Sequence, residues 1–398
     1  MVLFMESEML TESDMQGIFN TLLIHGGIDG DERTGAVSVP IYQTSTYRQI
    51  ELGQHKGYEY SRTGNPTREA LEALIRDLEG GHAGFAFASG MAAITAVLLL
   101  LKSGDKVIIS NNVYGGTFRV LDKVFKNFGL EYEIADTSNL EEVEKKVKSG
   151  VAAVIVESPA NPLLTITDIR KVSEIARNSG ALTIVDNTFM TPYLQRPLEL
   201  GADIVIHSAT KYLGGHSDVI AGLVVVKSRE IASRLQFLQN ATGGVLPPFD
   251  SWLLLRGIKT LSVRLDRHIE NTRYVVDFLK NHEGVTRIYY PGLEDSDGYE
   301  IHKNQAYGPG AMISFVLSEE YDIKLFFRSV ELITLGESLG GVESLVSHPA
   351  SMTHASIPYE IRQKVGILDN LIRLSVGIED KEAIVKDLRK AFEKAKSK

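Results

Sequence analysis

The feature that most constrains the fold is a regular alternation of short apolar runs with helix-period segments between about residues 66 and 226. The apolar runs, which we expect to be strands, cover residues 84–88, 106–110, 152–157, 181–186, 203–207 and 221–226. Helical patterns lie between them at residues 91–102, 116–128, 140–148 and 169–178. Strand–helix repetition predicts an α/β fold with a central, mostly parallel sheet covered by helices on both faces. In such a fold, ligands bind beyond the carboxyl ends of the strands.

The two ends of the chain follow other patterns. Residues 1–62 look irregular apart from one expected helix at 14–25, which Gly26 and Gly27 would end. From Pro247 the pattern changes to a long helix at about 249–281, then to strands at 285–290, 311–317 and 372–376 and a terminal helix at 381–398. We predict an N-terminal arm (1–62), a large domain (63–248) and a smaller C-terminal α/β domain (249–398).

Composition excludes several classes of function. The chain has no cysteine, so thiolate nucleophiles and cysteine-ligated metals are excluded, and its ten histidines show no metal-ligand spacing. A net charge of −9 without a basic stripe argues against nucleic-acid binding. No run reaches the roughly 18 apolar residues of a membrane helix, and the first ten residues lack the pattern of a secretion signal. We therefore expect a cytoplasmic protein with neither a membrane nor a metal partner.

One lysine, Lys211, follows an apolar strand and lies in a loop of hydroxyls and glycines, Ser-Ala-Thr-Lys-Tyr-Leu-Gly-Gly. Its amine can form a Schiff base with an aldehyde cofactor, and the hydroxyls of Ser208 and Thr210 can bind a phosphate. Asp186 ends another apolar strand, where a carboxylate partner for a pyridinium nitrogen would be needed. Read alone, the lysine fits a solvated turn and the aspartate a helix cap. Together they predict pyridoxal phosphate as the cofactor.

The same two residues occur within a wider set of segments that resembles one family. The segments lie at 58–67, 88–93, 113–117, 157–162, 185–188, 337–341, 348–354 and 372–379. In this order they are similar to the cystathionine γ-synthase and γ-lyase group of trans-sulfuration enzymes, and only about the first twenty residues fall outside the resemblance. The resemblance implies the aspartate aminotransferase-like fold, fold type I of pyridoxal phosphate enzymes. It also implies a homo-oligomer, a tetramer built from dimers with shared active sites, in which the arm reaches a neighbouring subunit.

The resemblance also implies roles for individual residues. The cofactor phosphate would be held by Gly90, Met91, Ser208 and Thr210, and by Tyr60 and Arg62 of the adjacent subunit. The ring would be contacted by Tyr114, Asn161, Asp186 and Thr188, with Tyr114 also exchanging protons with the substrate. The amino-acid substrate would be bound by Arg119, Glu337, Ser338, Thr353 and Arg373. Arg373 lies in an apolar strand, so we expect it to have a carboxylate partner, either that of the substrate or one within the chain.

Within this family the residues favour cystathionine γ-lyase, which yields cysteine, 2-oxobutanoate and ammonia, with Lys211 as the base. Methionine γ-lyases carry a cysteine where Gly116 stands, and dedicated β-lyases tend to have an aromatic in place of Glu337. Side activity on the β bond, the γ-synthase reaction and a β-lyase stay open as alternatives. A non-catalytic protein would be expected to have lost Lys211, Asp186, Tyr114 or Arg373. A sugar or amine aminotransferase would be expected to lack the segments 337–341 and 351–353.

Overall fold

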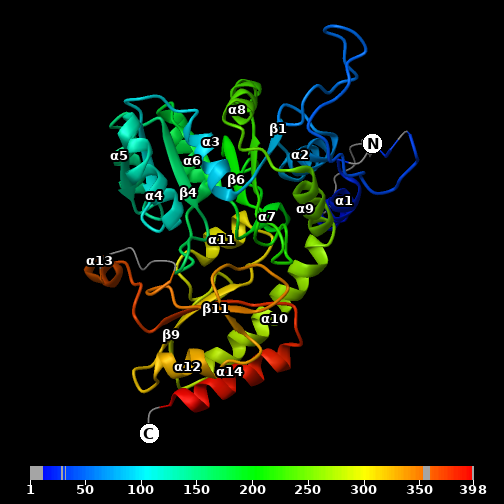
Figure 1. The fold of residues 1–398 in the computed structure, drawn as a ribbon. Helices are drawn as coiled ribbons and strands as arrows, with labels where there is room; N and C mark the ends of the chain where they lie inside the picture. The colour runs from blue at the N-terminus through cyan, green and yellow to red at the C-terminus, as the bar shows by residue number, and fades with distance from the viewer. Residues whose placement is uncertain (1–11, 28–29, 32, 353–358, 397–398) are drawn as a thin grey trace.

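The computed structural model describes residues 12–27, 30–31, 33–352 and 359–396. It consists of two stacked α/β bodies, with helices α9 (Pro248–Ile258) and α10 (Leu261–Lys280) running along one side and connecting them (Figure 1). Each body is built on its own sheet, one of seven strands and one of five. The predicted α/β class with a second, smaller α/β body is therefore confirmed. The division at residues 62/63 and 248/249 stays a prediction.

The larger sheet has the strand order β1-β7-β6-β5-β4-β2-β3. The strands are β1 (Ala83–Phe87), β2 (Lys106–Ser110), β3 (Glu131–Ala135), β4 (Ala153–Glu157), β5 (Leu182–Asp186), β6 (Ile204–Ser208) and β7 (Gly222–Val226). All pairs from β6 to β3 are parallel, and only β7 runs against its neighbours β1 and β6. This arrangement is the mostly parallel sheet that the alternating pattern predicted.

Alternate residues of each strand face two different cores. In β5, Ile184 packs with α3 (Gly90–Leu98), α4 (Gly115–Lys123) and α8 (Arg229–Thr242). Its neighbour Val185 packs on the other face with α1 (Glu12–His25), α2 (Pro66–Glu79), α7 (Thr191–Leu194) and α9. Helices α5 (Leu140–Val147) and α6 (Ile169–Asn178) cover a third cluster toward the β3 edge. Because both faces are covered, the central strands of this sheet are mostly apolar.

The smaller sheet has the order β10-β11-β12-β9-β8. Its strands are β8 (Val285–Tyr289), β9 (Met312–Leu317), β10 (Thr334–Leu335), β11 (Leu345–Ser347) and β12 (Leu371–Ser375). Helices α10, α12 (Ile323–Ser329) and α14 (Lys381–Ala395) pack against it, and α11 (Tyr299–Gln305) and α13 (Tyr359–Lys364) complete the body. Strand β12 is central and buried, and it delivers Arg373 to the space between the two bodies.

The structure differs from the predicted elements in three places. The expected helix at 249–281 is two helices, because Gly257 packs on the backbone of Gly214 and its carbonyl oxygen accepts hydrogen bonds from Thr260 and Arg264. Strand β3 was not predicted, because this edge strand is largely exposed and carries two glutamates. Helices α2 and α8 were not predicted either, although α2 begins at the cap signal Asn65-Pro66, where the Asn65 side chain accepts from the backbone N–H of Thr67.

Candidate active site

The carboxyl ends of β4, β5 and β6 meet at one cavity of about 490 Å³ that the smaller body closes from the other side. Its lining includes thirteen of the residues that the sequence predicted for the site: Gly90, Met91, Tyr114, Arg119, Asn161, Asp186, Thr188, Ser208, Thr210, Lys211, Glu337, Ser338 and Arg373. These residues come from positions 90 to 373 of the chain, so the fold brings distant segments together. The expectation of a site at the strand ends agrees with this cavity.

Lys211 lies in a tight turn directly after β6, where the Gly215 N–H donates to its carbonyl oxygen. Its Nζ donates to the hydroxyl oxygen of Ser338 at 2.7 Å. Burial, followed by the nearby Arg373 guanidinium, lowers the pKa of Lys211 to about 8, against the opposing effect of Glu337. An amine with this pKa is partly neutral near neutral pH, so it can act as a nucleophile and as a base.

Asp186 ends β5, is partly buried and lines the cavity. Its Oδ1 accepts from the backbone N–H of Thr188 at 3.1 Å and from the Thr188 hydroxyl. Burial raises the pKa of Asp186 above its ordinary value, although the Thr188 bonds and His207 lower it. Among the described residues, Asp186 forms no ion pair. A partly buried carboxyl in this state favours a cationic ligand group.

The amino end of α3 lies beside the end of β6. Ser89 caps this helix by accepting from the Ala92 N–H at 3.0 Å, which leaves the first amides of the helix facing the cavity. A Cβ on Gly90 would lie 3.0 Å from the Cβ of Ser208, so a larger residue would require Ser208 to shift. Backbone amides, a helix amino terminus and the Ser208 hydroxyl together suit a phosphate.

Arg373 is 4% exposed and has no carboxylate partner among the described residues. It donates instead to the side-chain oxygen of Asn161 at 2.9 Å and to the carbonyl oxygen of Ser338 at 3.0 Å. The alternative of an internal salt bridge is therefore not supported among the described residues, because an amide and a carbonyl hold the guanidinium. Burial lowers the pKa of Arg373 to about 10, so it is still a cation at neutral pH. A buried cation held only by neutral acceptors suits an anionic ligand.

Tyr114 is the N-cap residue of α4 and Arg119 lies in the middle of this helix, and both line the cavity. The ring of Tyr114 lies over Gly116, since a Cβ there would be 2.4 Å from the ring carbon Cε1. The alternative of a surface ion pair for Arg119 is not supported, because none forms within the described part of the chain.

A family sequence profile described as Cys/Met metabolism PLP-dependent enzyme matches residues 20–393. The chain belongs to this family. It is 58% identical to a cystathionine γ-lyase from Bacillus subtilis, over 94% of this chain and 98% of the relative. It is 57% identical to a cystathionine β-lyase from Lactococcus lactis, over the same shares of both chains. A crystal structure of cystathionine γ-lyase from Lactobacillus plantarum with L-serine superposes with a TM-score of 0.93 at 52% identity, covering 96% of this chain and all of that one.

Membership of the family confirms the predicted pyridoxal phosphate dependence and the fold type. The cavity fits this cofactor on its own observations. The α3 amino terminus suits the phosphate, the partly buried Asp186 suits the ring nitrogen, and the amine of Lys211 suits the aldehyde. The glycine at position 90 provides the close backbone approach that a phosphate needs.

Two predicted residues that the structure describes, Tyr60 and Arg62, do not line this cavity, and the prediction places both at the phosphate site of an adjacent subunit. Tyr60 and Arg62 lie on the arm, where Arg62 donates to the carbonyl oxygen of Asn240 at 2.6 Å and stacks on Tyr60. Thr353 lies outside the described residues. Thr210 lines the cavity, but its hydroxyl also bonds the backbone of Ala221, so it is less free than expected.

Sequence reasoning missed one site residue, Glu157. It ends β4 as Asp186 ends β5, and the two are register partners in adjacent parallel strands. The signal was present, because an acid that ends a buried apolar run is unusual at both positions.

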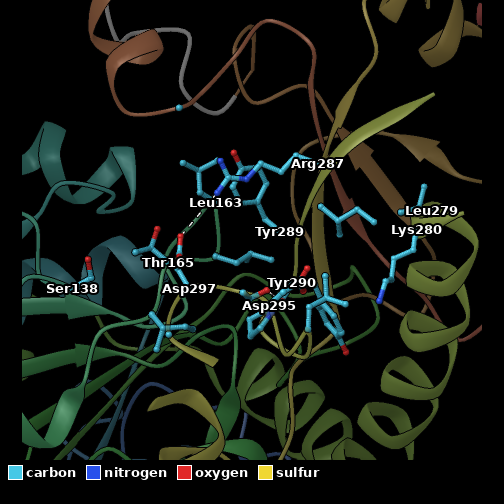
Figure 2. Close-up of a pocket in the computed structure, with 18 of the residues that line it drawn as sticks. Ser138, Leu163, Thr165, Leu279, Lys280, Arg287, Tyr289, Tyr290, Asp295 and Asp297 are labelled. Carbon is cyan, nitrogen blue, oxygen red and sulfur yellow. Dashed lines mark hydrogen bonds and ion pairs between the residues drawn. The ribbon is translucent and has the colours of Figure 1, made fainter. Parts of the chain in front are cut away.

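Figure 2 shows a larger cavity of about 900 Å³, which Lys211 does not line. It is lined by the loop 163–166, by β8 and by residues 290–301, and Arg287 reaches over Tyr289 at its edge. None of the predicted site residues that the structure describes lines it. Size therefore does not mark the chemical site here. In the described part of the chain there is also no acidic or histidine cluster that could hold a metal ion, and no helix long and apolar enough to cross a membrane.

Proposed function

We propose that this protein is a cystathionine γ-lyase, which cleaves L-cystathionine to L-cysteine, 2-oxobutanoate and ammonia. The observation that carries the proposal is the contact of the Lys211 amine with Ser338, which also bonds Arg373, beside Glu337 in the same cavity. One cavity thus contains a base, Lys211, a cation that can bind a carboxylate, Arg373, and a carboxylate, Glu337. These are the groups that a substrate with two amino-acid ends requires.

Bound pyridoxal phosphate supplies an electron sink for the substrate's α-carbon. Lys211 then has two tasks for its Nζ atom, which are to hold the cofactor between turnovers and to remove the proton from the α-carbon. The lowered pKa of about 8 supports both, because each needs an unprotonated amine. Ser338 orients the amine through the 2.7 Å hydrogen bond.

The cofactor would be held at both ends by side chains and amides of this chain. Asp186, fixed by Thr188, would bind the ring nitrogen. Tyr114 would cover the ring face, and Asn161 would lie at its edge. The phosphate would be bound by a set that combines amides and hydroxyls: Gly90, Met91, Ser208 and Thr210.

Asn161 and Ser338 hold the Arg373 guanidinium by hydrogen bonds but leave its positive charge uncompensated. Arg373 would therefore bind the α-carboxylate of the substrate. Glu337 would attract the distal ammonium group of cystathionine. Arg119 in the cavity lining would bind the distal carboxylate. The role expected for Thr353 stays a prediction.

Cleavage of the β bond is a second candidate, favoured by the relative from Lactococcus lactis that is named a cystathionine β-lyase at 57% identity. The presence of Glu337 supports the γ reaction. The γ-synthase reaction needs the same groups around Lys211 and differs in accepting cysteine as a second substrate.

The described part of the N-terminal arm supports the proposal of a homo-oligomer in which neighbouring subunits share active sites. Residues 33–62 loop away from the body in Figure 1, and they expose apolar side chains at Val37, Ile50 and Leu52, the last of which is fully exposed. Tyr60 and Arg62 lie at the end of this segment, so a neighbouring copy would receive them at its phosphate site. Light scattering of the purified protein tests this assembly, and a monomer would contradict it.

Product analysis with cystathionine as the sole substrate tests the proposed reaction. We expect 2-oxobutanoate, and no product from the Lys211→Ala variant. Pyruvate as the main product would indicate β cleavage instead. Turnover only after cysteine and an activated homoserine ester are added would indicate the synthase.

A further inference from the structure

Glu157 is the one carboxyl group among the described residues lining the cavity that the proposed reaction does not use. It is the last residue of β4, it is 7% exposed, and it lines the same space as Asp186. The two residues are direct register partners in parallel strands. Two acids at adjacent strand ends are unfavourable unless one of them is neutral or has a specific partner.

The partner of Glu157 is the backbone of Tyr114. Its Oε1 accepts from the Tyr114 N–H at 2.6 Å, across 43 residues of sequence. Tyr114 is the residue that caps α4, and its own side chain makes no capping bond there. Glu157 therefore anchors the start of α4 from a neighbouring strand, and it satisfies an amide that would otherwise be left without a partner.

This anchor bears on the tyrosine ring. The ring is 48% exposed and lies over Gly116, where the nearest other contact of a Cβ would be the sulfur of Met91. A ring that is packed on one side and open to solvent on the other is held only weakly by its own contacts. Its place in the cavity, near enough to Arg373 to influence that residue's pKa, depends on where the backbone of Tyr114 is fixed.

The charge state of Glu157 fits this task. Burial, followed by the neighbouring Asp186, raises the pKa of Glu157 well above its ordinary value, which favours the neutral acid. A neutral carboxyl still accepts a hydrogen bond through its carbonyl oxygen. It also leaves Asp186 as the one carboxylate of the pair that can balance a cationic ring.

We propose that Glu157 is a positioning residue that fixes the backbone of Tyr114 and thereby places the tyrosine ring at the site. The inference rests on the proposed function only in that Tyr114 acts on the cofactor and substrate. The anchor requires an oxygen at the right distance from the Tyr114 N–H, but it does not require a charge. The two conservative substitutions at position 157 should therefore have different effects on this hydrogen bond. Glu157→Gln keeps an oxygen at the same distance, whereas Glu157→Asp keeps the acid but withdraws it by one methylene.

Hydrogen exchange of the cofactor-free protein tests the anchor without any activity. In the segment 112–118, Glu157→Asp should speed exchange of the Tyr114 amide by about 10-fold, as expected for loss of a buried hydrogen bond. Glu157→Gln should leave the rate within about threefold of the parent. The exposed Glu131 in β3 of the same sheet gives the matched control Glu131→Asp, with no change expected. Equal exchange rates in the parent and Glu157→Asp would overturn the proposal.

A double-mutant cycle then tests whether Glu157 acts through Tyr114. Glu157→Asp should lower kcat about 10-fold in the parent and less than about twofold when Tyr114 is already alanine. A loss of the same size in both backgrounds would show that Glu157 acts independently of the tyrosine, against the proposal. If the parent does not turn over cystathionine, the proposed function fails, and the exchange experiment alone decides the role of Glu157.

Discussion

The side-chain amine of Lys211 lies 2.7 Å from the hydroxyl oxygen of Ser338. The same serine accepts a hydrogen bond from Arg373 through its carbonyl oxygen at 3.0 Å. Ser338 has a φ of 104°, a conformation that a side chain disfavours, so its neighbours hold it in place. One strained residue thus contacts both the proposed base and the proposed carboxylate-binding cation.

A substitution that removes only the Ser338 hydroxyl should distinguish the effects of these two contacts. Ser338→Ala loses the bond to Lys211 but keeps the carbonyl that binds Arg373, so kcat should fall about 10-fold while KM changes little. Steady-state kinetics with cystathionine measures both constants. A raised KM at unchanged kcat would show that Ser338 serves substrate binding only.

The lowered pKa of Lys211 predicts a pH dependence in the cofactor-free protein. The amine should become neutral, and therefore reactive, as the pH rises through about 8. The unfolded chain binds more protons than the folded one between about 8 and the ordinary value of 10.5, so this group makes stability rise with pH in that window. Acylation of Lys211, followed by peptide mass spectrometry against pH, measures the midpoint. Arg373→Met should move it upward, and a parent midpoint near 10.5 would contradict the account.

The guanidinium of Arg373 should bind the substrate rather than support the fold alone. Arg373→Ala should raise KM by about 100-fold, as expected when a buried charge pair is broken. Arg287→Ala, which changes a largely exposed arginine in β8 of the same sheet, is the matched control and should leave KM unchanged. Normal KM in a folded Arg373→Ala protein would assign the guanidinium a structural role.

The close approach of β7 to the α3 amino terminus makes Gly222 a stability-determining position. A Cβ there would lie 2.1 Å from the carbonyl oxygen of Ser89, so Gly222→Ala must displace the phosphate end of the site. We expect a loss of about 1–3 kcal/mol in the free energy of unfolding, together with weaker cofactor binding. Gly17→Ala, in α1 with open space around the new methyl group, should show neither effect in the same thermal melts and cofactor titrations.

Much of the larger sheet was predictable, because buried parallel strands are apolar along their whole length. The bounds of β2 and α6 agree with the prediction at every residue. The edge strand β3 was not predictable in this way, since Glu131 and Glu133 interrupt any apolar run. The break between α9 and α10 depends on a backbone contact between Gly257 and Gly214, which no local pattern records.

The site residues also divide into those that could be predicted from the sequence and those that could not. Residues that end strands, such as Asp186, and residues just after them, such as Lys211, could be found because the chain order places them at one edge of the sheet. The partners of Arg373 could not, because they are an amide and a backbone carbonyl from two distant loops. Glu157 could have been found by the reasoning that found Asp186.

The most direct test of the account is the location of the covalently bound cofactor. Borohydride reduction of the yellow holoenzyme, followed by proteolysis and mass spectrometry, should place the pyridoxyl phosphate group on the peptide that contains Lys211. The Lys211→Ala protein should lack both the adduct and the visible absorption band. An adduct on a different lysine, or an unchanged visible spectrum in Lys211→Ala, would contradict the central claim.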